Sequence, residues 1–526
     1  MKIKENILLR IYLIYTLLLL SAVAVLLKGY RIQTYKDNFW VKKSQEMSTK
    51  LFPVKGERGS IYTHDGNLLA TSNPYFDLYV DFGSEAMTKD LFNDNVDSLA
   101  YYMANKFKDK SHREYKQALI SARTKKLRYY PIKKRINYAD LKEIKTWPLL
   151  REGKYKGGLI VETKQSRSTP YDILAKRTIG EHRTNAQPVG IEAAYNEYLA
   201  GAEGNVIKQK FAGNTWVPID TKLSIDPKDG SDVYTTLDIN IQDLTENALM
   251  KAMDSSQAEF GCAIVMDVKT GAIKAIANLG KTASGNYWEL NNYAVIHNSE
   301  PGSTFKAASY LMLLDKNAIK LNDTIGINKG SWNFYGRRMH DDYMTEYSLS
   351  VREAFARSSN IAIARLIDQQ YRNNKSEFYH NMVKYGLTEP SGIDLIGESM
   401  PKVTKPDKWS KLSLPWRATG YEQMFSPIQI LTFYNTIANN GYKARPYLVE
   451  KISKNGKLIK EFKPEISNEP IASLDAINKI KELLKSVIEH PRGTGRSILS
   501  ENFEFAGKTG TAKILNRKEG GYSNAN

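Results

Sequence analysis

The pattern of hydrophobic and polar positions begins with one long apolar segment. Residues 11–27 carry no charge and follow the polar and basic start MKIKENILLR. Together with the apolar residues at 7–9, this segment is just long enough to span a hydrocarbon core of about 30 Å. An A-x-A sequence at 22–24 also fits signal-peptide cleavage, but apolar residues continue beyond it. The pattern therefore favours an uncleaved membrane anchor.

The next two hundred residues alternate between polar segments and short apolar repeats. Residues 28–50 are polar with scattered aromatics and are interpreted as a stalk. Asp65 and Gly66 stand between alternating apolar residues, which predicts a hairpin. Residues 88–150 are predicted to be helical, and the basic, aromatic stretch 122–135 is interpreted as a solvated surface. Residues 186–235 are rich in glycine and turn residues and suit a boundary between domains.

From residue 233 onward the pattern predicts a mixed fold. A strand leads into an amphipathic helix, and a hairpin follows with its turn at 269–271. Helical stretches dominate to about residue 372, and a late strand is expected over 501–515. Strand, helix, hairpin, helices and a returning strand together predict an α/β (α+β) fold with an antiparallel sheet.

Composition and charge limit the classes of function. A chain of 526 residues with 42% hydrophobic content can build two or three domains. The net charge of +18 suits an anionic partner such as nucleic acid, anionic lipid or an acidic polymer, and the anchor puts nucleic acid out of reach. The single cysteine, Cys262, lies in an apolar strand and is interpreted as a buried hydrophobe. No metal or cofactor motif is found, so neither is expected.

A serine and a lysine stand three residues apart in SEPGSTFKAASYL, residues 299–311. If a helix begins near Pro301 and Gly302, Ser303 and Lys306 share one face. Burial of the apolar helix lowers the pKa of Lys306, and a neutral amine beside a hydroxyl is a general base beside a nucleophile. The free N–H groups of the helix start would stabilise an oxyanion near Ser303.

Two further motifs follow the first in a fixed order. An S-x-x-K sequence alone is a weak signal, and a second one at 399–402 has Pro401 in a loop, where no shared helical face is expected. SSN at 358–360 and KTGT at 508–511 complete the order S-x-x-K, S-x-N, K-T-G, which is typical of serine acyltransferases that react with penicillin. A phosphate-binding loop around Lys508 is excluded because Asn502 stands where that motif requires glycine.

On these motifs the chain resembles class B penicillin-binding proteins, which are membrane-anchored peptidoglycan D,D-transpeptidases, and most of all their septal, cell-division member. The resemblance covers nearly the whole chain, and its shorter matches lie at 58–70, 190–204, 300–306, 438–441 and 493–495. It implies a serine transpeptidase/β-lactamase-like domain with an antiparallel sheet and helices. An elongated N-terminal pedestal domain and one transmembrane helix would precede that domain.

The same resemblance implies the organisation of the chain in the cell. Residues 1–10 would be a cytoplasmic start and 11–30 a single-pass anchor in the cytoplasmic membrane. Residues 31–232 would form the pedestal, or dimerisation, domain. Residues 233–526 would form the penicillin-binding domain, on the extracytoplasmic or periplasmic side.

The catalytic roles are carried over from the family to the matching positions. Ser303 would attack the carbonyl between two terminal D-alanines of a stem peptide, and Lys306 would take its proton. Ser358, with Lys508 nearby, would relay a proton to the leaving amine. An amine of a second stem peptide would then resolve the acyl-enzyme as a cross-link, and β-lactams would trap Ser303. The residues implied to bind substrate are Asn360, Thr509, Gly510 and Thr511, and the N–H groups of Ser303 and Thr511 would form the oxyanion hole.

Partners and rival functions follow from the same comparison. The implied partners are peptidoglycan stem peptides, the lipid-linked precursor, β-lactams, the membrane, a membrane glycosyltransferase and other division proteins, without nucleic acid. One rival is a β-lactamase, against which the anchor and the long N-terminal region argue. Another is a non-catalytic β-lactam sensor or division scaffold that keeps the motifs.

The C-terminal part raises an expectation of its own. The sequence stops at Asn526, 15 residues after Thr511, whereas the family continues with further strands and a terminal helix. We expect the strand carrying Lys508 to lack its hairpin partner, and the 526-residue chain to react poorly with penicillin.

Overall fold

The computed structural model describes residues 2–34, 49–181, 188–211, 215–218, 225–511, 513–516 and 521–524. Its first element is the helix α1 (Lys2–Thr34). The part from Glu5 to Arg31 is long and apolar enough to cross a membrane, with a mean hydropathy of 2.2 and none of it buried in the protein. Most of the predicted stalk at 28–50 lies outside the described residues.

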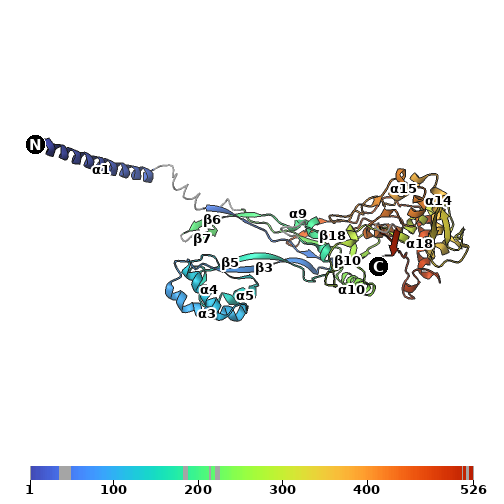
Figure 1. Cartoon of the computed structure of the whole chain (residues 1–526), viewed down its shortest axis with the longest axis horizontal. Helices are drawn as coiled ribbons and strands as arrows, with labels where there is room; N and C mark the ends of the chain where they lie inside the picture. The colour runs from blue at the N-terminus through green and yellow to red at the C-terminus, as the bar shows by residue number, and fades with distance from the viewer. Residues whose placement is uncertain are drawn as a thin grey trace. The chain divides into compact units, whose positions relative to one another are not determined.

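The chain divides into two compact units, and α1 belongs to the first of them. The first unit contains residues 1–57, 74–166 and 201–229. It holds a three-stranded antiparallel sheet, and the second half of β3 pairs with β4 and β5. The helices α3, α4 and α5 lie beside β3 and β5 (Figure 1). The elements of this unit are β1 (Thr49–Val54), β6 (Gly204–Phe211), β7 (Thr215–Pro218), β3 (Leu68–Val80), β4 (Tyr130–Ile136), β5 (Leu159–Ser168), α3 (Lys89–Phe107), α4 (His112–Thr124) and α5 (Tyr138–Ile144).

The strand β4 corrects the prediction of helix over 88–150. Ile132 and Ile136 are both buried and stand four apart, which is a helical spacing. The strand register shifts between Phe76 and Leu78, and Arg135 adopts a positive φ of 57°. A spacing of four residues also corresponds to two periods of a strand, so the burial of these two residues fits either structure. Periodicity therefore did not distinguish this strand from a helix.

The second unit contains residues 58–73, 167–200 and 230–526 and holds the three motifs. One of its sheets has the order β19–β18–β8–β2–β3. The hairpin predicted at Asp65 and Gly66 is confirmed, with Gly66 at a φ of 87°. Asp238 caps α10 by accepting bonds from the N–H groups of Asn240 and Ile241, as a helix start requires. The bounds are β19 (Lys457–Glu461), β18 (Val449–Lys454), β8 (Asp232–Thr235), β2 (Ile61–Tyr62) and α10 (Ile239–Ser256).

A second sheet and a group of helices surround the motifs. The sheet has the order β11–β10–β9, and its β9–β10 hairpin confirms the turn predicted at 269–271. The helices enclose the largest hydrophobic core of this unit, to which α12 contributes nearly all its residues. The elements are β9 (Phe260–Met266), β10 (Ile273–Lys281), β11 (Tyr287–Trp288), α12 (Lys306–Asp315), α13 (Val351–Ala356), α14 (Asn360–Tyr371), α15 (Lys375–Lys384), α16 (Ser413–Ala418), α17 (Pro427–Ala438) and α18 (Leu474–Glu489).

Four short strands interrupt the region that was predicted to be mainly helical up to residue 372. They pair locally as β12 with β15 and β13 with β14. Strands of three or four residues are too short to show an alternating pattern in the sequence. Their bounds are β12 (Thr324–Gly326), β13 (Ser331–Phe334), β14 (Arg337–His340) and β15 (Ser348–Ser350).

The late strand predicted over 501–515 is wrong for residues 501–511. The structure assigns no strand there, and β20 (Lys513–Asn516) pairs only with β21 (Gly521–Asn524) among the described strands. The Gly507 N–H donates to the carbonyl of Leu484 on α18 at 3.2 Å. A backbone bond to a helix and side-chain contacts, rather than a strand ladder, therefore hold the KTG segment, residues 507–511.

Candidate active site

Ser303 lies on a tight turn that leads into α12. Residues Gly302–Phe305 form a 3₁₀ turn, and the α-helix begins at Lys306. The turn is held against Gly420, because the Gly302 N–H donates to the Gly420 carbonyl at 3.3 Å. A Cβ atom at Gly420 would lie 2.0 Å from the Gly302 carbonyl oxygen, so only glycine fits there. The predicted helical turn joining Ser303 and Lys306 is confirmed.

The amine of Lys306 is completely buried at the bottom of the site. Its Nζ donates to the carbonyl oxygen of Ser358 at 2.5 Å and lies 3.1 Å from the Ser358 Oγ. Burial, and then the nearby charge of Lys508, hold the pKa of Lys306 well below its ordinary value. The described hydrogen bonds of this amine go to Ser358 and not to Ser303. Burial therefore favours the uncharged form of Lys306, and its amine is in direct contact with the second motif.

Ser358 occupies the centre of the site. It lies between α13 and α14 with a positive φ of 59°, an uncommon conformation for a residue with a side chain. Lys508 Nζ donates to the Ser358 Oγ at 2.8 Å, so this hydroxyl lies between two lysine nitrogens. Burial lowers the pKa of Lys508 to about 8. Such an arrangement is stable only if at least one of the two amines is uncharged, since two adjacent ammonium groups repel each other.

The other residues predicted to belong to the site make separate contacts and do not bond Ser358 in the described hydrogen bonds. Gly510 faces the turn of Ser303, where an added Cβ atom would lie 2.8 Å from Thr304 Cγ2. Thr509 Oγ1 donates to Thr494 Oγ1 at 2.7 Å. Asn360 Nδ2 donates to the carbonyl of His340 at 3.2 Å. Thr511 is exposed. The structure thus joins Ser358, Lys306 and Lys508 directly, and places Gly510 against the turn of Ser303.

Two positions in the site were missed by sequence reasoning about site residues. Asp341 accepts hydrogen bonds from the Ser359 hydroxyl and from the N–H groups of Asn360 and Ile361, at the start of α14. A carboxylate at a helix N-terminus satisfies free N–H groups and interacts favourably with the helix dipole. Thr494 is the partner of Thr509. Asp341 stands in a polar stretch with no motif, whereas Thr494 lies in GTG at 493–495, which the family resemblance includes.

Replacement of Asp341 by Asn is expected to slow acylation roughly 10- to 100-fold, because a charged acceptor of several hydrogen bonds is worth about 1.5–3 kcal/mol. The negative charge of Asp341 also raises the pKa of Lys306. Its loss should therefore move the acid limb of the acylation rate to lower pH. The measurement is the rate of reaction with a chromogenic β-lactam against pH. Asp342→Asn is the matched control: its charge also raises the pKa of Lys306, so the acid limb should move in the same direction, but the rate on the plateau should stay normal. A normal plateau rate in Asp341→Asn would contradict this role.

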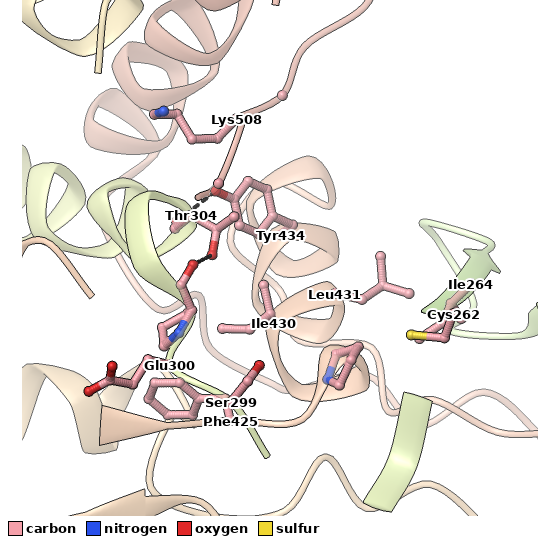
Figure 2. A pocket seen from close by; sticks show the side chains of 14 residues that line it. Cys262, Ile264, Ser299, Glu300, Thr304, Phe425, Ile430, Leu431, Tyr434 and Lys508 are labelled. Carbon is pink, nitrogen blue, oxygen red and sulfur yellow. Dashed lines mark hydrogen bonds between the residues drawn. The ribbon is translucent and has the colours of Figure 1, made fainter. Parts of the chain in front are cut away.

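A cavity of about 580 Å³ opens beside the turn of Ser303 (Figure 2). Its walls come from β9, α17 and the KTG segment, and Tyr434 donates to the carbonyl of Thr304 at 2.7 Å. Cys262 lines the wall on β9, and burial raises the pKa of its thiol to about 11. A thiol that stays protonated is a poor nucleophile, in agreement with the interpretation of Cys262 as a small hydrophobe. The cavity lies next to the turn of Ser303, because Pro301 and Thr304 both line it.

Comparison with known families identifies the class of protein. The penicillin binding protein transpeptidase domain matches residues 261–526, and the penicillin-binding protein dimerisation domain matches residues 53–187. The chain belongs to the penicillin-binding protein transpeptidase family. The resemblance to class B members and the predicted fold class are confirmed.

Individual relatives and solved structures agree with this family. The peptidoglycan D,D-transpeptidase FtsI of Buchnera aphidicola is 26% identical over 68% of the chain and 60% of its own length. PbpB of Mycolicibacterium smegmatis is 26% identical over 69% of the chain and 57% of its own length. PenA of Neisseria meningitidis, a probable peptidoglycan D,D-transpeptidase, is 25% identical over 94% of the chain and 81% of its own length. The chain thus spans less than two thirds of the first two relatives.

The fold itself is similar to that of penicillin binding protein 2X from Streptococcus thermophilus. The two share a TM-score of 0.74 at 20% identity, over 90% of this chain and 73% of that one. Penicillin binding protein 3 of Mycobacterium tuberculosis, in complex with aztreonam, has a TM-score of 0.63 at 21% identity, over 90% of this chain and 85% of that one. At these identities the likeness concerns the fold alone.

Proposed function

We propose that the chain is a peptidoglycan D,D-transpeptidase that works through an acyl-enzyme on Ser303. The observation that carries this proposal is the completely buried amine of Lys306, one helical turn from Ser303 and in contact with Ser358, with its pKa held well below the ordinary value. Neutral lysine is a competent general base, and a serine without such a neighbour is a weak nucleophile. The names of the relatives FtsI and PenA support the choice of reaction.

The proton movements follow from the contacts of Ser358. Ser303 Oγ attacks the carbonyl carbon between the two terminal D-alanines and gives its proton to Lys306. The C–N bond then breaks, and the leaving D-alanine amine takes a proton through the hydroxyl of Ser358, which bonds Lys508 on its other side. The N–H groups of Ser303 and Thr511 stabilise the oxyanion, at roughly 3–4 kcal/mol for each donor.

Substrate binding uses the third motif and the first residue of α14. Lys508 and Thr509 hold the terminal carboxylate, and Asn360 bonds an amide of the stem peptide. Thr511 pairs with the peptide as an added strand. Gly510 has no side chain, which keeps the space beside Thr304 open to the substrate. The amine of a second stem peptide then attacks the acyl-enzyme and forms the cross-link, whereas a β-lactam leaves Ser303 acylated.

The rival β-lactamase function requires a base that activates water for fast deacylation. Asp341 contacts the second motif, and its oxygens already accept three hydrogen bonds. Glu300, beside the turn of Ser303, accepts a bond from the Glu422 N–H. We therefore expect the penicillin adduct to be long-lived. A chain that turns over penicillin repeatedly would favour the β-lactamase, and a chain with the motifs but no exchange activity would favour a sensor or scaffold.

A D-amino acid exchange assay tests the reaction itself. The chain is incubated with a peptide ending in D-alanyl-D-alanine and a labelled D-amino acid as acceptor. The proposal predicts release of D-alanine and incorporation of the label, both blocked by prior treatment with penicillin. Incorporation that penicillin leaves unchanged, or release of D-alanine without any acceptor product, would contradict transpeptidation.

The cellular setting belongs to the same proposal. The helix α1 anchors the chain once in the cytoplasmic membrane, with residues 233–526 on the outer side, and residues 31–232 act as the pedestal. The likeness to FtsI supports a role in septal wall synthesis, with the lipid-linked precursor, a membrane glycosyltransferase and other division proteins as partners. A fluorescent fusion should concentrate at the division site, and an even distribution along the cell wall would contradict the septal role.

The pH dependence of acylation should be bell-shaped. The rate rises with pH as Lys306 loses its proton, with a midpoint well below 10.5, the ordinary pKa of lysine. It falls again near pH 8, where Lys508 loses the charge that holds the carboxylate. Lys508→Arg should remove the upper limb, because a guanidinium stays charged. The acylation rate of a chromogenic β-lactam against pH measures both limbs, and a flat profile would count against both lysines.

A further inference from the structure

A polar pocket of about 270 Å³ lies between the β13–β14 hairpin and α14. Both elements reach the active site, because α14 begins at Asn360, whose amide bonds the last residue of β14, His340. Asp368 in the pocket follows Asn360 by eight residues, which is about 12 Å along a helix. The residues that line the pocket are Trp332, Asn333, Phe334, Tyr335, Arg365, Asp368, Gln369 and Arg372.

The pocket carries an uncompensated positive charge. Asp368 is shared by the Tyr335 hydroxyl, at 2.9 and 3.0 Å, and by Arg372 at 3.4 Å. Arg365 has no carboxylate as a partner among the described residues. Its guanidinium stacks on Trp332 at 3.7 Å from the ring centroid and donates to the carbonyl of Gly326.

The state of Arg365 favours an anionic ligand. The side chain is half-buried, and burial lowers the pKa of its guanidinium, which no nearby carboxylate offsets. A guanidinium has five N–H groups in a planar fork that matches a carboxylate with two parallel hydrogen bonds. The bond to Gly326 uses one of these groups. The exposed amides of Asn333 and Gln369 lie at the same pocket and can bond the peptide or acetamido groups that accompany a carboxylate in wall peptides.

We propose that this pocket binds a second carboxylate of the peptidoglycan strand whose stem peptide occupies the active site. The identity of this ligand rests on the proposed transpeptidase function. An extended peptide covers about 3.3–3.6 Å per residue, so about four residues of stem peptide span the distance from the motifs to the pocket. Arg365 thereby fixes the direction of the strand and contributes to the choice of substrate, without taking part in the chemistry.

The test uses the full chain in detergent micelles, with the active site blocked by penicillin. The probe is a soluble disaccharide-tetrapeptide with free carboxylates, and binding is measured by titration calorimetry. Saturable binding is expected, weakened roughly tenfold or more by Arg365→Gln or by amidation of the carboxylates. Arg338→Gln, on the same hairpin but outside the pocket, is the control and should bind normally. Gln369→Ala changes only an exposed side chain and should weaken binding even if Arg365→Gln folds poorly.

The outcomes separate this inference from the proposed function. Equal binding by the normal chain, Arg365→Gln and Gln369→Ala, or no binding at all, overturns the pocket proposal. Normal penicillin acylation of the same variants shows at once that the active site is intact in that case. If penicillin fails to react with any of the chains even after prolonged incubation, the transpeptidase proposal fails, and the titration of the unblocked chain still decides whether the pocket takes a carboxylate.

Discussion

Ser303→Ala is expected to abolish acylation by β-lactams and stem peptides, with a loss of at least about 10⁴-fold. Removal of a nucleophile leaves only the residual effect of substrate binding and of the oxyanion donors. The change deletes one oxygen from a half-buried side chain at the start of a helix. Its effect on the free energy of unfolding should therefore stay within about 1 kcal/mol. Labelling with a fluorescent penicillin, together with thermal unfolding, measures both quantities.

The chain supplies its own matched control for this change. Ser399 belongs to the second S-x-x-K sequence, and its hydroxyl donates to the carbonyl of Ile296. Ser399→Ala removes the same atom from a motif without a buried lysine, and should be labelled like the normal chain. Labelling of Ser303→Ala at an undiminished rate would place the nucleophile elsewhere and refute the assignment.

Lys306→Met is expected to slow acylation by roughly 10²- to 10⁴-fold, which is the usual contribution of a general base. Methionine has a similar length and fills the buried space, but cannot accept the proton of Ser303. Burial of an amine is costly even when it is neutral, and the new side chain needs no hydrogen bond. We therefore expect activity to fall while the free energy of unfolding stays the same or rises. A lower acylation rate without a lower free energy of unfolding would show that the variant has lost its base and not its fold.

Lys402 provides the comparison for Lys306. It ends the second S-x-x-K sequence and is exposed on β16 (Lys402–Val403). Lys402→Met should change neither acylation nor stability by a measurable amount. An acylation rate in Lys306→Met equal to that of the normal chain would show that another group takes the proton.

The sequence predicted those parts of the site that depend on local geometry. Three residues are one turn of a helix, so the spacing of Ser303 and Lys306 was enough to place them together. The apolar residues after Lys306 correctly indicated its burial. The hairpins at 63–67 and 267–272 were equally predictable, because turn residues between alternating apolar positions leave few other structures.

Contacts between distant segments could not be predicted in this way. Asp341 reaches the start of α14 across 18 residues, and no spacing rule links the two. The lysine nitrogens of Lys306 and Lys508 meet at Ser358 although 202 positions separate them. The KTG segment resembles a strand in composition, but strand formation depends on a neighbouring strand, which no single segment encodes.

The central claim is that Ser303 becomes covalently acylated. Peptide mapping by mass spectrometry after prolonged incubation with penicillin tests it most directly. The expected result is one penicilloyl group per chain, carried by the peptide that contains Ser303 and absent from the Ser303→Ala variant. An adduct on any other peptide, or an unmodified chain after complete incubation, would contradict it.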